Sequence, residues 1–255
     1  MIPADRYDEI DVARGIAILM MIVFHTLFDL AFLGVYPVNI STGFWRWFAV
    51  ATASLFLLIA GISLTISHAR ALERSGAAIT PPVQIAIKYL RRGSGIFCWG
   101  LLVTLATWLY LGDQLVIFGI LHLIGVSIML APLFFRFRKK NILVGAVWIT
   151  IGIALVYSAI SGPVFLLGLG IHPASFSSVD YTPLFPWFGI ILIGMGLGEH
   201  LYPDGKRAFT VPHIRSMVSG TIALLGRHSL LIYLVHQPAI LLVLQVVAGV
   251  PVFSW

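Results

Sequence analysis

The chain reads Arg14-Gly15-Ile16-Ala17-Ile18-Leu19-Met20-Met21-Ile22-Val23-Phe24-His25 over its first apolar stretch, with an arginine at one end and a histidine at the other. In an α-helix this eleven-residue step carries His25 roughly 16 Å along the axis and returns it to within about 20° of the face of Arg14. Asp29 follows one turn later on the same face, where it is expected to bond the second ring nitrogen of His25. Ionisable residues on one face of an apolar helix usually line a bundle interior or an aqueous path, so this face predicts a functional site.

The composition is that of a membrane protein. Hydrophobic residues make up 59% of the 255 residues and charged residues only 10%, whereas a soluble domain has about 25% charged residues. The mean hydropathy is +0.99. Cys98 is the single cysteine, so no intramolecular disulfide is expected. Residues 1–9 are polar and no cleavage site follows a short apolar core, so we expect the first helix to be retained.

Seven apolar runs are long enough to cross the roughly 30 Å apolar layer of a bilayer. We therefore expect an all-α, polytopic membrane helix bundle of about seven transmembrane helices that forms one domain over residues 1–255. Two shorter apolar segments, Val164–Ile171 and Met217–Leu225, are expected to be interfacial or re-entrant, and the second is alternatively an inward extension of the last helix. The seven runs are Val12–Tyr36, Phe44–Ser67, Gly93–Leu111, Leu115–Phe135, Ile142–Ser161, Leu184–Leu201 and Gly226–Val250.

The basic residues predict the orientation of this bundle through the positive-inside rule. Fifteen of the sixteen lysines and arginines fall on one side of the predicted spans, and Arg46 alone falls on the other. We therefore expect the amino terminus inside and the carboxyl terminus outside. The net charge of +6 follows from this asymmetry, so it points to anionic lipid headgroups or an anionic cofactor on the inner face rather than to nucleic acid. The fifteen are Arg6, Arg14, Arg70, Arg74, Lys88, Arg91, Arg92, Arg136, Arg138, Lys139, Lys140, Lys206, Arg207, Arg215 and Arg227.

Several histidines in or near the spans are candidates for chemistry. His25 with Asp29 is a possible general-base pair, because a carboxylate on one imidazole nitrogen leaves the other basic; a structural hydrogen bond between helices is the alternative. His122, His228 and His236 are each either hydrogen-bonded core residues or site residues. Pro238 removes a backbone hydrogen bond beside His236 and is expected to open a polar pocket there.

Other site chemistries receive less support from the sequence. His25, His122 and His236 with Asp29 or Asp180 would suit zinc, but no pair of these histidines has the helical i, i+4 spacing, so no metal is expected. The last span has no lysine for a retinal Schiff base. The pair Gly194 and Gly198 is expected to form a close helix-packing face rather than a cofactor loop.

Taken in order, several motifs resemble the catalytic domain of the heparan-alpha-glucosaminide N-acetyltransferases, and more widely the membrane acyltransferases that modify surface glycans. The resemblance runs over nearly the whole chain. Its motifs are Arg14-x10-His25, Phe56-Leu-Leu-Ile-Ala-Gly61-Ile-Ser63, Lys88-Tyr-Leu-Arg91-Arg92, Gly119-Ile-Leu-His122, Asp180-Tyr-Thr-Pro183-Leu-Phe-Pro186-Trp187 and Gly226-Arg-His-Ser229-Leu-Leu-Ile-Tyr233-Leu-Val-His236.

The resemblance implies acyl transfer across a membrane, from acetyl-CoA on the inner face to an amino sugar or another glycan amine or hydroxyl on the outer face. It implies that Arg14, Lys88, Arg91 and Arg92 hold the anionic donor, and that His25 acts as general base. Asp29, His236 and His122 are the further candidate catalytic residues. Partners would be acyl-CoA, the acceptor, membrane lipids and, as an open option, a second copy of the chain, in the plasma (cytoplasmic) membrane.

One departure bears on the acceptor and the base. The eukaryotic glucosaminide enzymes have asparagine where His25 stands and a histidine near the places of Tyr36 and Asn39. His25 therefore follows the polysaccharide-acyltransferase pattern. Two other classes stay open: a transporter or channel that uses the buried Arg, His and Asp residues as a solute or proton path, and a seven-helix zinc hydrolase.

Overall fold

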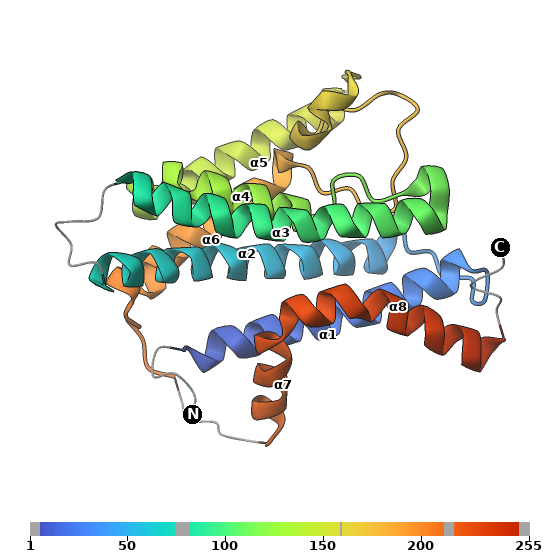
Figure 1. Cartoon of the computed structure of the whole chain (residues 1–255), viewed down its shortest axis with the longest axis horizontal. Helices are drawn as coiled ribbons and strands as arrows, with labels where there is room; N and C mark the ends of the chain where they lie inside the picture. Colours follow the sequence, from blue (N-terminus) through green and yellow to red (C-terminus); the bar gives the residue numbers. More distant parts are fainter. Residues whose placement is uncertain (1–5, 75–81, 159, 212–216, 250–255) are drawn as a thin grey trace. The chain divides into compact units, whose positions relative to one another are not determined.

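The computed structural model describes residues 6–74, 82–158, 160–211 and 217–249. Helices dominate these ranges (Figure 1), and their only β-type pairings are two isolated bridges. The predicted all-α membrane bundle is therefore confirmed. The α-helices are α1 (Asp8–Phe32), α2 (Gly43–Arg74), α3 (Pro82–Leu111), α4 (Ile120–Phe134), α5 (Asn141–Ser158), α6 (Leu184–Leu201), α7 (Met217–Arg227) and α8 (Ser229–Ala248); the 3-10 helices are η1 (Gly112–Gln114), η2 (Phe135–Lys140), η3 (Val164–Leu169) and η4 (Pro203–Gly205).

Six segments of the described chain are long and apolar enough to cross a membrane. One of them, Ile120–Ser158, contains both α4 and α5. The two helices are separated at η2, where Arg138 adopts a φ of 47° and interrupts the helical backbone. The seven predicted runs thus correspond to α1–α6 and α8. At 15 residues α4 is the shortest of these seven, below the roughly 20 residues of a full crossing.

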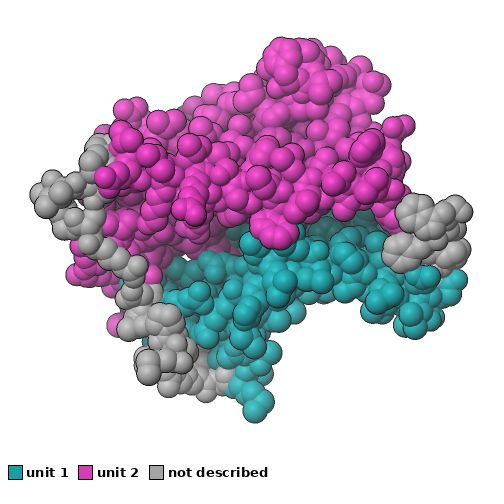
Figure 2. All heavy atoms as spheres, viewed as in Figure 1, with its two compact units in different colours: residues 1–56, 211–255 teal, residues 57–210 magenta. Residues whose placement is uncertain are grey.

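The chain divides into two compact units, coloured separately in Figure 2. Unit 1 comprises residues 1–56 and 211–255, and unit 2 comprises residues 57–210. The long helix α2 contributes its first part to unit 1 and its second part to unit 2. That the whole chain acts as one domain stays a prediction.

Within unit 1, α1 and α8 run side by side in the same direction (Figure 1). Asp11 near the start of α1 bonds Arg227, the last residue of α7. Asp29 near the end of α1 bonds Gln237, midway along α8. Two helices that cross a bilayer in the same direction are separated by an odd number of intervening crossings, so that the total is odd. This parity favours the seven predicted spans, with α4 and α5 crossing separately.

The end of α1 is set by Gly34. Its φ of 70° lies in the left-handed region, where glycine has no steric penalty. Its N–H donates to Ala31 O at 3.1 Å, and the next N–H, of Val35, donates to Leu30 O at 2.9 Å. These are the two bonds of a Schellman motif, which satisfies the last carbonyls of the helix. The predicted span to Tyr36 is therefore wrong by four residues, because α1 ends at Phe32.

Two further predicted boundaries are corrected. The fourth span begins at Ile120 rather than Leu115, because η1 and an extended segment precede it. The segment from Met217 does not extend the last helix: His228, with φ −100° and ψ 19°, separates α7 from α8. That α7 lies at the membrane interface stays a prediction. Residues 212–216, with Arg215, and residues 250–255 lie outside the described residues.

The packing of α1 against α7 depends on two glycines. A Cβ on Gly15 would overlap the main chain of Ile222, and a Cβ on Gly226 would overlap the carbonyl oxygen of Asp11. Small residues allow helix backbones to approach closely in membranes. This contact fixes the start of α1 against the end of α7, directly before α8 begins.

In unit 2, α6 packs against both the second part of α2 and α5. A Cβ on Gly194 would overlap the carbonyl oxygen of Leu58, and one on Gly198 would come within 2.9 Å of Thr65. A Cβ on Gly189 would lie 2.7 Å from the carbonyl oxygen of Gly145 in α5. The prediction that Gly194 and Gly198 form a close helix-packing face is confirmed.

The basic segments of unit 2 gather at one end of its helices. The His68 ring of α2 stacks on Phe135 of η2 with centroids 3.7 Å apart. Arg138 pairs with Glu199 of α6 at 2.9 Å. The Phe135 ring also lies 5.2 Å from that of Tyr89 in α3. These contacts join the regions that the sequence places on the inner side; which side of the membrane they face stays a prediction.

Candidate functional site

Two histidines face each other in unit 1. His25 of α1 and His236 of α8 have ring centroids 4.8 Å apart and ring planes at 69°. Their positions are separated by most of the chain, and the parallel packing of α1 and α8 brings them to one level. His236 is buried, with 9% of its surface exposed, and His25 is half-buried. The site thus has one partly accessible imidazole, that of His25, and one buried imidazole, that of His236.

Backbone carbonyls hold both rings. His25 Nδ1 lies 3.0 Å from Met21 O, and His236 Nδ1 lies 2.6 Å from Tyr233 O. A carbonyl oxygen only accepts, so in a neutral ring each Nδ1 carries the proton and donates it. Each Nε2 then presents a lone pair. His236 Nε2 is buried and has no hydrogen-bond partner in the described part of the chain.

Asp29 does not hold His25, contrary to the expectation from their spacing. Asp29 Oδ1 accepts a hydrogen bond of 2.7 Å from Gln237 Nε2, and the task of fixing the His25 ring falls to Met21 O. The Asp29 carboxylate is 2% exposed, and its other oxygen, Oδ2, has no hydrogen-bond partner among the described residues. The carboxylate therefore lies in the same layer as the histidines without orienting either ring.

Gln237 is a site residue that the sequence analysis did not select. It follows His236 directly, in a helix whose other residues are mostly apolar. A buried amide in such a helix needs a partner, and this requirement was the available signal. That partner is Asp29, 208 positions away, and no local pattern identifies a partner at this separation.

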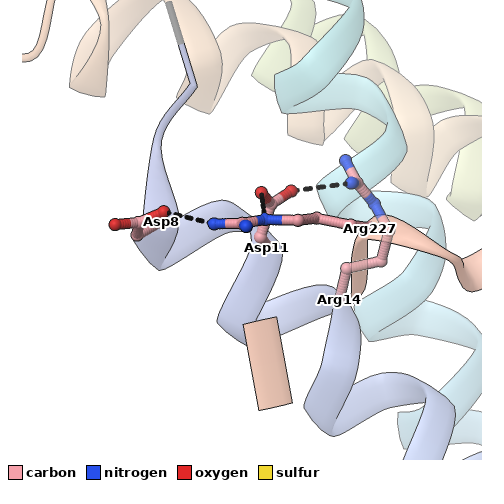
Figure 3. Close-up of polar contacts among 4 residues, drawn as sticks. All are labelled: Asp8, Asp11, Arg14 and Arg227. Carbon is pink, nitrogen blue, oxygen red and sulfur yellow. Dashed lines mark hydrogen bonds and ion pairs between the residues drawn. The ribbon is translucent and has the colours of Figure 1, made fainter. Parts of the chain in front are cut away.

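Arg14 belongs to an ion-pair network at the start of α1 (Figure 3). Its Nη1 lies 3.2 Å from Asp11 Oδ1, and Arg227 Nε lies 3.1 Å from the other oxygen of Asp11. Arg227 Nη2 also pairs with Asp8 at 2.9 Å. Asp11 is 8% exposed at its side chain, so two guanidinium groups surround a nearly buried carboxylate. Arg14 is thus already engaged, which weakens its predicted role as a free anion ligand.

The other predicted anion ligands lie in unit 2, near the start of α3. Lys88, Arg91 and Arg92 are exposed, and no ion pair involves them within residues 57–74, 82–158 and 160–210. Lys88 Nζ lies 5.9 Å from the ring centre of the fully buried Tyr89. An exposed, unpaired cluster of three cations is suited to charge-assisted bonds with phosphates.

His122 lies in unit 2, in the first turn of α4. It is 2% exposed, and its ring packs edge-on against Phe97 at 5.0 Å and stacks on Phe118 at 5.7 Å. Its Nε2 lies 3.5 Å from Thr104 Oγ1, which donates to Val116 O. The structure therefore brings together His25, Asp29 and His236 in unit 1, whereas His122 belongs to the other unit.

Asp180 holds the start of α4. Its Oδ2 accepts a 3.4 Å hydrogen bond from the N–H of Ile120, one of the N–H groups that a helix leaves unpaired. Burial raises the pKa of Asp180 to about 6, and the bond to Ile120 opposes this rise. Burial also raises the pKa of the neighbouring Tyr181 to about 12, and its hydroxyl donates to Leu167 O.

No group of three or more His, Cys, Asp or Glu side chains in the described ranges is arranged to hold a metal ion. The paired histidines and Asp29 therefore offer bases and acceptors rather than a ready coordination shell. The arrangement is suited to taking a proton from a group that reaches His25 Nε2.

Comparison with known proteins found one family. The family model described as heparan-alpha-glucosaminide N-acetyltransferase, catalytic, matches residues 6–238. This range includes α1, both histidines of the pair and Gln237. No curated protein and no solved structure matches the chain significantly.

Proposed function

Because the chain belongs to the heparan-alpha-glucosaminide N-acetyltransferase catalytic family, we propose that it transfers an acetyl group from cytoplasmic acetyl-CoA to an extracytoplasmic amine or hydroxyl of a glycan. The family comprises transmembrane acetyltransferases, and the six membrane-length apolar segments agree with a multi-pass membrane protein. We propose the identity of the donor and of the acceptor, the side of the membrane on which each binds, and the plasma membrane as the location.

The donor is proposed to bind with its phosphates at the basic end of unit 2. Lys88, Arg91 and Arg92 supply three exposed cations, and none of them pairs with a carboxylate among that unit's described residues. In unit 1, binding of a phosphate by Arg14 requires that its bond to Asp11 be exchanged for one to the phosphate. Charge-assisted hydrogen bonds of this kind are stronger than neutral ones. From the positive-inside rule we expect these cations on the cytoplasmic side, where acetyl-CoA is available.

His25 is proposed as the general base. Its Nε2 takes the proton from the acceptor nitrogen or oxygen while that atom bonds to the acetyl carbon. The carbon–sulfur bond of the thioester breaks, and the electron pair leaves with the CoA thiolate. The proton returned to the thiolate completes the exchange, so atoms and charge balance. His236 and Asp29 lie beside this base, and His122 remains a third candidate in unit 2.

A single observation carries the assignment of the base. His25 Nδ1 bonds a main-chain carbonyl at 3.0 Å, which fixes the tautomer and leaves Nε2 basic without the help of a carboxylate. His25 is also only half-buried, whereas His236 is buried together with its Nε2, so His25 is the more accessible of the two facing imidazoles.

The proposal is tested with purified protein in detergent. We expect acetyl-CoA and CoA to raise the melting temperature, because a ligand that binds only the folded state stabilises it. We also expect transfer of labelled acetyl to a panel of amino sugars and sugar alcohols. Zinc chloride is the control: stabilisation by zinc without any response to CoA would instead support a metal hydrolase. Absence of both CoA binding and acetyl transfer would contradict the proposal.

A further inference from the structure

Three buried polar atoms are unpaired on His236 and on the two residues that accompany the His25–His236 pair on α1 and α8. They are Asp29 Oδ2, His236 Nε2 and Gln237 Oε1, and none has a hydrogen-bond partner in the described chain. They come from one turn at the end of α1 and two consecutive residues of α8. Buried polar atoms without partners are costly in an apolar environment. The burial of these three unpaired atoms therefore needs an explanation beyond packing.

All three atoms are hydrogen-bond acceptors when Asp29 is ionised. The carboxylate and the amide oxygen carry lone pairs only, and His236 donates through its other nitrogen to Tyr233 O. His25 Nε2 is likewise a lone pair, because its Nδ1 is engaged by Met21 O. Neighbouring acceptors that lack a donor can bind an added proton between them. A mixed set of imidazole nitrogens and one carboxylate suits a proton better than a hard alkali cation, which prefers oxygen ligands.

We propose that His236 is a positioning residue that shares the transferred proton with His25, holding it between the two Nε2 atoms while Asp29, fixed by Gln237, balances the charge. This inference rests on the proposed function, since the proton is the one that the acceptor loses. The rings face each other with centroids 4.8 Å apart, a separation that a hydrogen bond between two ring nitrogens can span. His236 acts through His25, because its own Nε2 is buried.

The proton balance is closed. The acceptor N–H or O–H breaks and its proton goes to His25 Nε2 as the acetyl carbon bonds to the acceptor atom. The Nε2–H of the resulting imidazolium donates to His236 Nε2, and both Nδ1–H groups stay on their carbonyls. The thiolate then recovers the proton from the pair as the thiol of CoA. No oxidant, reductant or net proton is required.

The charged and titratable groups around the pair are few. On α1 they are His25 and Asp29, and on α8 they are Tyr233 and His236. The part of α2 in unit 1 carries only Arg46. At the other end of α1, Arg14 and Arg227 are paired with Asp11 and Asp8. Asp29 is accordingly the one carboxylate at the level of the histidines within the described residues of unit 1.

The test measures the pH dependence of acetyl transfer. Sharing the proton with His236 Nε2 stabilises the protonated pair, so loss of this nitrogen should move the acid limb of kcat/KM to lower pH. His236→Gln should show this shift together with a kcat roughly 10- to 100-fold lower and an unchanged KM for acetyl-CoA, a smaller loss than the removal of a general base typically causes. His228→Gln changes an exposed histidine between α7 and α8 and should behave as wild type.

A wild-type kcat and a wild-type pH profile in His236→Gln would overturn the shared proton. If that variant does not fold, Asp29→Asn serves instead, because its amide oxygen still accepts the bond from Gln237. We expect its acid limb of kcat/KM to move to lower pH, since the charge that favours the protonated pair is gone; an unmoved limb would overturn the role of Asp29. A wild-type protein that transfers no acetyl group contradicts the proposed function itself. An active wild-type protein whose variants do not differ from it in these ways contradicts only the shared proton.

Discussion

Gln237 donates a hydrogen bond of 2.7 Å to Asp29, and this bond joins α8 to α1 next to the paired histidines. We expect Gln237→Leu to lower the free energy of unfolding by about 1–3 kcal/mol, because it leaves a buried carboxylate without its donor. The double variant Asp29→Asn with Gln237→Glu reverses the donor and acceptor and should recover part of the loss. Thermal unfolding in detergent measures both. Gln245→Leu, in the same helix, is the matched control; an equal loss in the control would contradict a specific role of the bond.

The glycine contact between α2 and α6 gives a second prediction, for unit 2. Gly61→Ala should destabilise the protein by about 1–3 kcal/mol, because the new Cβ would overlap the carbonyl oxygen of Ile191 and approach Gly194 to within 2.9 Å. Gly95→Ala in α3 is the control, since no atom lies within 4 Å of its added Cβ. The melting temperatures decide: a drop for Gly61→Ala and none for Gly95→Ala is expected, and equal behaviour would speak against close packing.

Asp180 predicts a dependence of stability on pH. Its pKa is raised from 3.8 to about 6 in the folded protein, so the folded state favours the protonated carboxyl. This contribution to stability is full below about pH 4 and is lost as the pH rises through 6, by at most about 3 kcal/mol. Asp180→Asn cannot ionise but still accepts the bond from Ile120. Its melting temperature minus that of wild type should therefore rise from pH 4 to pH 7 and then level off; a difference independent of pH would refute the shifted pKa.

Binding of the donor should depend on the cations of α3 more than on Arg14. Neutralising Arg91 or Arg92 with glutamine should cost about 1.5–3 kcal/mol per lost contact, which is roughly a 10- to 150-fold rise in the Kd for CoA. Arg14→Gln should have a smaller effect, since Asp11 already pairs with this arginine. Arg46→Gln, on the other side of the predicted bundle, should have none. Isothermal titration with CoA measures the Kd of each variant and so tests this ranking. Equal losses of affinity in the Arg14 and Arg46 variants, with none in the Arg91 variant, would refute this site.

The helices could be predicted from the sequence because each depends on a local property, a run of apolar residues of sufficient length. The residues at which the helices end were harder to predict. The end of α1 at Phe32 depends on a positive φ at Gly34, and a glycine alone does not show which backbone conformation it takes. The sequence separated Met217–Leu225 from the last span at Gly226, but the residue at the break itself, His228, is neither glycine nor proline, so its position two residues later was not predictable.

The candidate site shows the same division between local and distant information. The helical period correctly placed His25 and Asp29 one turn apart, but each residue then bonds a different group, Met21 O and Gln237. The facing of His25 and His236 depends on how α1 packs against α8, and no spacing within one helix contains it. The pairing of Arg14 with Asp11 was within reach of sequence reasoning, since the two lie three residues apart.

The central claim is that His25 transfers the proton for acetyl transfer across the membrane. The most direct measurement uses sealed vesicles with acetyl-CoA on the cytoplasmic face and labelled product scored on the opposite face, for wild type and His25→Ala. We predict turnover by the wild-type protein, and a rate about 10²- to 10⁴-fold lower for His25→Ala with an unchanged Kd for CoA. Full turnover by His25→Ala would remove this residue from the mechanism, and wild-type turnover only when both substrates share one face would contradict transfer across the membrane.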